Sequence, residues 1–150
     1  MAGGRGFMGD VPDAARLLGL AGLIPFVGLA ALALVGPASW SDTVLKALAY
    51  YGATILAFMG GCRWGFAAAG LGRGAELGPL AWAVGPSLWA WVALMLPPPF
   101  EKEMLGLGLL ILYVMDLRLT AEGGAPAWWP QLRLPLTLGA AASLFAAVWA

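Results

Sequence analysis

The sequence predicts an all-α integral membrane protein, a bundle of five transmembrane helices in a single domain, residues 1–150. Hydrophobic residues make up 61% of the chain and charged residues only 11%, and mean hydropathy is +0.84. A soluble domain of this size needs more charge than that. Apolar stretches recur at the length that crosses a bilayer. No stretch alternates with the strand period, and no internal repeat is visible.

The predicted spans cover residues 17–35, 45–70, 77–96, 104–120 and 135–150. Gly36 and Pro37 end the first span, and a glycine-rich stretch beginning at Gly70 ends the second. Three prolines from Pro97 end the third. Pro135 suits the first turn of the last span. The run 17–35 is longer than a signal-peptide core of about 7–15 residues, so we expect it to remain as a span.

Composition also narrows the function classes. Formal net charge is zero, so nothing indicates a nucleic-acid partner. The chain has no histidine, which excludes His-ligated haem, His-based zinc sites and Ser-His or Cys-His catalysis. Cys62 is the one cysteine, with no base beside it to make it a nucleophile. We therefore expect no enzyme activity, no cofactor and no metal.

Basic residues predict the orientation. Six of them fall on the N-terminal side and two on the other, which places the N-terminus inside and the C-terminus outside. The first set is Arg5, Arg16, Arg63, Arg73, Arg118 and Arg133, and the second is Lys46 and Lys102.

The stretch 47–70 is predicted to be the central helix. One face carries Phe58, Gly61 and Gly65, and nearly the opposite face carries Gly60 and Arg63. Small residues let helices approach closely in lipid, and Gly61 and Gly65 have the familiar spacing for such a contact. We expect neighbouring helices on both faces. Two prolines in other spans, Pro25 and Pro86, are further candidate packing positions.

Arg63 and Asp116 are predicted to meet. Each lies far down a helix that runs from outside to inside, at about 25 Å and 20 Å from its start. A lone buried carboxylate is expensive in lipid, so a partner is expected. In the alternative, Arg63 reaches the headgroups, and Asp116 pairs with Arg118, Arg133 or water.

The prolines extend this site. Pro25 and Pro86 cannot donate to the carbonyls four residues before them, and both carbonyls fall in the inner half of the membrane. An arginine could satisfy such a carbonyl as well as a carboxylate. The candidate polar site comprises Arg63, Asp116, Ser87, Tyr51 and Trp64. In the alternative, the prolines only kink their helices for packing.

Three stretches carry a resemblance to a known family. They are residues 18–26 (LGLAGLIPF), 51–65 with GGCRWG at its end, and 86–91 (PSLWAW), and Asp116 and residues 129–137 fit as well. The chain resembles the uncharacterised membrane family that includes mitochondrial transmembrane protein 69 and many proteobacterial proteins. The resemblance implies a five-span inner-membrane protein of bacteria or mitochondria. It implies no activity, ligand or catalytic residue.

Two functions follow as hypotheses. The first is a structural, accessory or assembly component that packs against other inner-membrane proteins, because small residues lie on opposite faces of the central helix. The alternative is a small transporter or ligand-binding membrane protein whose polar site lies near Arg63 and Asp116. In both, the lipid bilayer is the surrounding partner.

Overall fold

The computed structural model describes residues 8–150, and this part of the chain is all-helical, without strands. The all-α class is therefore confirmed. The helices are α1 (Asp13–Ala21), α2 (Leu23–Val35), α3 (Ser41–Ala68), α4 (Leu77–Ala93), α5 (Phe100–Ala121) and α6 (Trp129–Ala146). Two 3₁₀ turns, Ala38–Trp40 and Ala147–Trp149, precede α3 and follow α6.

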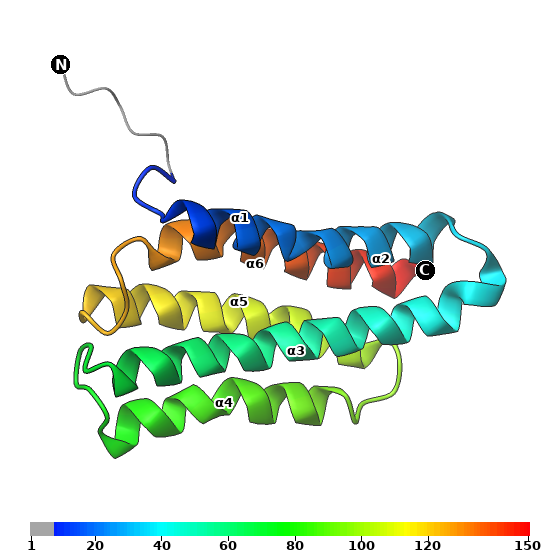
Figure 1. The fold of residues 1–150 in the computed structure, drawn as a ribbon. Coiled ribbons are helices and arrows are strands. Elements are labelled where there is room, and N and C mark those ends of the chain that lie inside the picture. The colour runs from blue at the N-terminus through cyan, green and yellow to red at the C-terminus, as the bar shows by residue number, and fades with distance from the viewer. Residues whose placement is uncertain (1–7) are drawn as a thin grey trace.

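The helices run up and down in one bundle. The start of α1, the α3–α4 connection and the α5–α6 connection lie at one end (Figure 1), which we call the arginine end because Arg16, Arg73 and Arg118 lie there. The α2–α3 and α4–α5 connections and the C-terminus lie at the other end. The long helix α3 contacts α2, α4, α5 and α6, so it is central, as the sequence predicts.

Four stretches are long and apolar enough to cross a membrane: Asp13–Val35, Ala38–Ala68, Phe100–Ala121 and Trp129–Trp149. The first joins α1 and α2. Helix α4 has 17 residues, about 25 Å of helix against a hydrocarbon core of about 30 Å. The described chain therefore shows four candidate spans, and the count of five is not established by helix length.

Three helices begin earlier than the sequence suggests. Helix α3 begins at Ser41 rather than residue 45, α5 at Phe100 rather than 104, and α6 at Trp129 rather than Pro135. Pro130 sits in the first turn of α6, where its missing N–H has no helical partner in any case. Pro135 lies inside the helix and loses only its bond to the carbonyl of Gln131. The earlier start of α6 creates much of the site described below.

A break at Gly22 separates α1 from α2. The Tyr51 hydroxyl donates a hydrogen bond of 2.9 Å to the Gly22 carbonyl. The Phe26 ring meets the Tyr51 ring edge-on, with centroids 4.8 Å apart. Tyr51 thus bonds the carbonyl next to the one that Pro25 frees, which is that of Ala21, and the hydrogen bond of Arg63 goes to Asp116 instead.

Only one of the two small-residue faces of α3 packs within the bundle. A Cβ at Gly60 would lie 2.6 Å from the Ala83 carbonyl oxygen and 3.2 Å from Pro86, so α3 and α4 meet closely here. A Cβ at Gly61 or Gly65 would meet nothing within 4 Å. The expectation that Gly61 and Gly65 form a close contact is wrong for the described chain. The physical reason is rotation, because α3 turns the face with Gly60 and Arg63 toward the core.

The end opposite the arginine end holds a second buried ion pair. Lys102 is 2% exposed, and its Nζ lies 2.5 Å from Glu101 Oε1 in the first turn of α5. Nearby, Trp89 Nε1 donates to the Met104 carbonyl at 2.8 Å, which ties α4 to α5. Lys102 therefore lies inside the bundle rather than at its surface.

Candidate functional site

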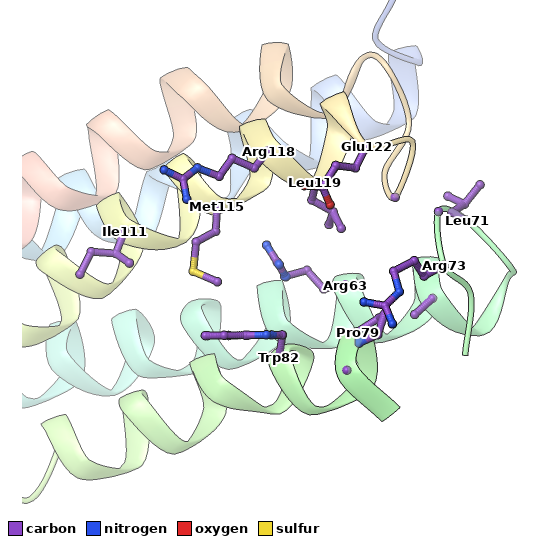
Figure 2. A pocket seen from close by; sticks show the side chains of 14 residues that line it. Arg63, Leu71, Arg73, Pro79, Trp82, Ile111, Met115, Arg118, Leu119 and Glu122 are labelled. Atoms are coloured by element: carbon purple, nitrogen blue, oxygen red, sulfur yellow. The ribbon is translucent and has the colours of Figure 1, made fainter. Parts of the chain in front are cut away.

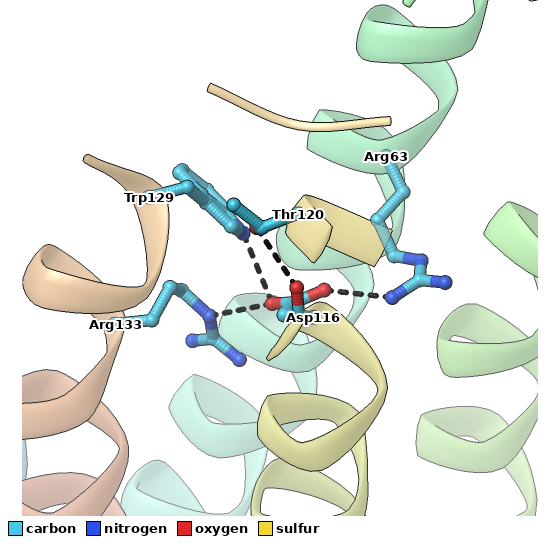
Figure 3. Close-up of polar contacts among 5 residues, drawn as sticks. All are labelled: Arg63, Asp116, Thr120, Trp129 and Arg133. Carbon is cyan, nitrogen blue, oxygen red and sulfur yellow. Dashed lines mark hydrogen bonds and ion pairs between the residues drawn. The ribbon is translucent and has the colours of Figure 1, made fainter. Parts of the chain in front are cut away.

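Asp116 of α5 is the polar centre of the bundle. It is fully buried, at 0% exposure. Its Oδ1 accepts a hydrogen bond of 2.7 Å from Arg63 Nη1 of α3, so the predicted contact is confirmed. Its Oδ2 accepts from Arg133 Nε at 3.0 Å and from Trp129 Nε1 at 3.1 Å, both of α6 (Figure 3). One carboxylate therefore joins three helices.

Helical spacing explains how α6 supplies two of these donors. Trp129 and Arg133 are four residues apart, so they share a face of the helix. The Phe66 ring of α3 packs edge-on against Trp129, with centroids 5.0 Å apart. The Thr120 hydroxyl donates a hydrogen bond of 2.9 Å to the backbone carbonyl of Asp116. The Asp116 carboxylate is thus held from α3 and α6 together.

The cluster carries more positive than negative charge. Two guanidinium groups share one carboxylate, a formal charge of +1. Arg63 is 8% exposed and Arg133 is 2% exposed. A buried charge that lacks a counter-charge costs several kcal/mol. The cluster therefore favours a further acceptor, and most of all an anionic one.

Arg133 has hydrogen-bond donors that lack a partner in the described chain. Only its Nε makes a hydrogen bond within the described chain. Nη2 is buried without a partner, and so is the Thr137 hydroxyl one turn further along α6. Buried polar groups are normally hydrogen-bonded, and an unpaired one points to a water, an ion or a ligand.

Three residues of the predicted polar site lie elsewhere. Ser87 and Trp64 are exposed, and no hydrogen bond within residues 8–150 joins either of them to the cluster. Tyr51 bonds Gly22 instead. Adjacent residues do not share a helix face. Pro86 packs on Gly60 and Arg63 faces the core, so Ser87 and Trp64 point outward.

Arg133 and Trp129 were the residues that sequence reasoning missed as site members. The sequence offers Arg133 only as an alternative partner for Asp116, and Trp129 only as part of the stretch that fits the family. Their four-residue spacing was the available signal. A last helix starting at Pro135 hides that signal, because both residues then fall in a loop.

Two cavities flank the cluster, and each is lined by one of the arginines that bind Asp116. The first, the arginine cavity, has a volume of about 880 Å³ and lies at the arginine end (Figure 2). Arg63, Arg73, Arg118 and Glu122 are its charged lining residues. Acidic residues already lie beside its arginines, because Glu122 lines the cavity and Glu76 binds Arg73.

The second cavity, the apolar cavity, has a volume of about 450 Å³. Among the described residues that line it, Arg133 is the one with a charge. The other walls come from α1, α2, α3, α5, α6 and the turn before α6. They are Ala15, Leu18, Gly19, Gly22, Leu23, Phe26, Tyr51, Ile55, Phe58, Met59, Cys62, Leu109, Trp128, Trp129, Leu132, Leu136 and Ala140.

Comparison with protein-family models assigns this chain to a family. The family described as "Protein of unknown function (DUF3429)" matches residues 11–149. The chain belongs to this family. The match includes all six helices and every residue of the Asp116 cluster.

Two curated relatives agree with this assignment. "Transmembrane protein 69" of Xenopus tropicalis is 36% identical over 143 residues, 90% of this chain and 53% of the relative. "Transmembrane protein 69" of Mus musculus is 30% identical over 137 residues, 86% of this chain and 53% of the relative. The DUF3429 chain thus spans about half the length of these relatives. No solved structure matches it.

These findings identify a membrane protein of an uncharacterised family, as the resemblance in the sequence suggests. Neither the family description nor the names of the relatives state an activity. Within residues 8–150, no group of three or more His, Cys, Asp or Glu residues could hold a metal ion. The Asp116 cluster and its cavities are therefore the features of the DUF3429 chain that bear on its chemistry.

Proposed function

We propose that this chain is a small ligand-binding membrane protein, and that its site is the apolar cavity with Arg133 at its polar end. The observation that supports this most is Arg133 itself. It is buried, it lines the cavity, and its terminal nitrogens have no hydrogen-bond partner in the described chain. Of the two hypotheses from the sequence, this is the second, with the ligand placed at Arg133 and with Arg63 and Asp116 behind it.

The form of the cavity supports binding. Small-molecule sites are concave, mostly apolar and about 300–1,000 Å³, with a few polar groups that set orientation. The apolar cavity matches this with a volume of about 450 Å³ and one charged lining residue. Asp116 and Trp129 hold the Arg133 side chain in place, which lowers the cost of ordering it on binding.

Filling the cavity should remove a bound molecule. We expect mild extraction and native mass spectrometry to show a bound small molecule on the wild-type chain and none on Ile55→Trp. Ile55 lines the cavity, and an indole there occupies its volume. Val114→Trp is the matched control, because Val114 is 51% exposed on α5 and lines neither cavity. Equal occupancy in the two variants, or an empty wild-type chain, would contradict the proposal.

A second function, as an accessory component, is favoured by the open face of α3. Gly61 and Gly65 leave a strip of α3 where a second helix could approach closely. In the same purification, a partner protein that copurifies with Ile55→Trp but no longer with Gly61→Leu would support the accessory role. A protein that stays bound to both variants would count against this face.

We also propose five membrane crossings, with the N-terminus inside and the C-terminus outside, in the bacterial inner membrane, or the mitochondrial inner membrane in relatives. The alternation of helix ends supports an odd number of crossings (Figure 1). The exposed basic residues at the arginine end, Arg73 and Arg118, and the partly exposed Arg16 support the orientation.

Reporter fusions test this topology. Fusions at Gly72 and Gly124 should be active on the cytoplasmic side, and fusions at Pro98 and after Ala150 on the outer side. These positions lie at alternate ends of the bundle. A fusion at Gly72 that reads as outside would reverse the orientation, and matching readings at Gly72 and Pro98 would remove α4 as a crossing.

A further inference from the structure

We propose that the occupant of the apolar cavity is a single-chain amphiphile ending in an anionic oxygen group, a fatty carboxylate or its phosphate equivalent. This rests on the proposed function and names its ligand class. The head group pairs with Arg133, and the chain lies along α3 between α1 and α6.

Charge balance selects the head group. The Arg63–Asp116–Arg133 cluster carries a formal charge of +1. No acidic residue lines the apolar cavity within the described chain. A carboxylate paired with Arg133 would bring the cluster to neutrality and form charge-assisted hydrogen bonds, which are about twice as strong as neutral ones. A neutral carbonyl would satisfy the donors and leave the charge in place.

The walls select an alkyl chain. Helix α3 supplies Tyr51, Ile55, Phe58, Met59 and Cys62, which follow helical spacing and form one continuous side of the cavity. From Tyr51 to Cys62 the helix rises about 16 Å. Cys62 is one residue from Arg63, at the level of the cluster. An elongated apolar chain of medium length therefore fits the cavity with its head at Arg133.

The surface of the bundle supplies a way in from the bilayer. Leu18 of α1 is 73% exposed, and Phe58 of α3 is 61% exposed. Both also line the apolar cavity. An amphiphile dissolved in the surrounding leaflet can therefore reach the cavity between α1 and α3 without crossing water.

The test measures binding of three probes to the full chain in nanodiscs of zwitterionic lipid. The probes are dodecanoate, dodecyl phosphate and dodecanol, which share a chain and differ in the head group. We expect dodecanoate to bind saturably and at least about tenfold more tightly than dodecanol, because only the anion offsets the buried charge. If dodecyl phosphate binds more tightly than dodecanoate, the same anionic chemistry holds and a single-chain phosphate lipid is the source.

Variants separate this inference from the proposed function. Ile55→Trp should abolish dodecanoate binding, and Val114→Trp should retain it. If dodecanol and dodecanoate bind equally and Ile55→Trp blocks both, the anionic class is overturned and the cavity remains a ligand site. If no probe saturates and native mass spectrometry finds no bound molecule, the proposed function falls as well. The comparison of probes on the wild-type chain stands even if a variant fails to fold.

Discussion

Asp116→Asn should lower the free energy of unfolding by about 3–5 kcal/mol, the usual cost of leaving buried charge uncompensated. The substitution keeps the shape of the side chain and removes its charge. Arg63 and Arg133, which both bind the carboxylate, would then be two buried cations without a counter-ion. The measurement is unfolding in mixed micelles with increasing denaturing detergent.

Matched variants show whether charge is the cause. Asp42→Asn, at an exposed position in the first turn of α3, should change stability by less than about 0.5 kcal/mol. Arg133→Met should cost less than Asp116→Asn, because it leaves the Arg63–Asp116 pair intact and neutral. The double variant Asp116→Asn with Arg133→Met should lose less than the sum of the two single losses. Strict additivity would show that the cluster is not coupled through Asp116.

Gly60→Leu should lower stability by about 1–3 kcal/mol, the range for overpacking a close contact. The first added carbon would already lie 2.6 Å from the backbone carbonyl of Ala83, which cannot move aside as a flexible side chain could. The neighbouring variant Gly61→Leu should change stability by less than about 0.5 kcal/mol, because a Cβ there meets nothing within 4 Å. Folded yield and detergent-induced unfolding measure both.

The comparison is sharp because the two glycines are adjacent in one helix and differ only in the face they occupy. Substitution of either removes the same backbone freedom and adds the same side chain. A larger loss for Gly61→Leu than for Gly60→Leu would show that α3 is rotated relative to the described bundle. A loss for Gly61→Leu that appears only in cells would indicate a partner on that face.

Much of the architecture could be predicted because it depends on local composition and length. Hydropathy alone predicts apolar helices in a membrane, since lipid leaves the backbone few other structures. The contact of Arg63 with Asp116 could be predicted by counting residues along two parallel helices, because the rise per residue is constant. The cost of an unpaired carboxylate in lipid made a partner necessary.

Other features needed the tertiary structure. The sequence shows two small-residue faces on α3, but the rotation of the helix decides that Gly60 packs and Gly61 does not. The same rotation turns Trp64 outward, and the contact of Pro86 with Gly60 turns Ser87 outward. Local spacing cannot determine rotation, because each face is apolar enough to meet either lipid or protein.

Arg133 also shows which features follow from the sequence and which need the tertiary structure. The sequence by itself determined that this membrane chain buries Asp116 against a basic partner. Only the tertiary structure decided that there are two partners, because α6 begins at Trp129 and so carries Arg133 to the carboxylate. A prolyl residue inside a helix costs one hydrogen bond, and the contacts of Trp129 and Arg133 with Asp116 offset that loss. Such compensation across helices is absent from any local pattern of residues.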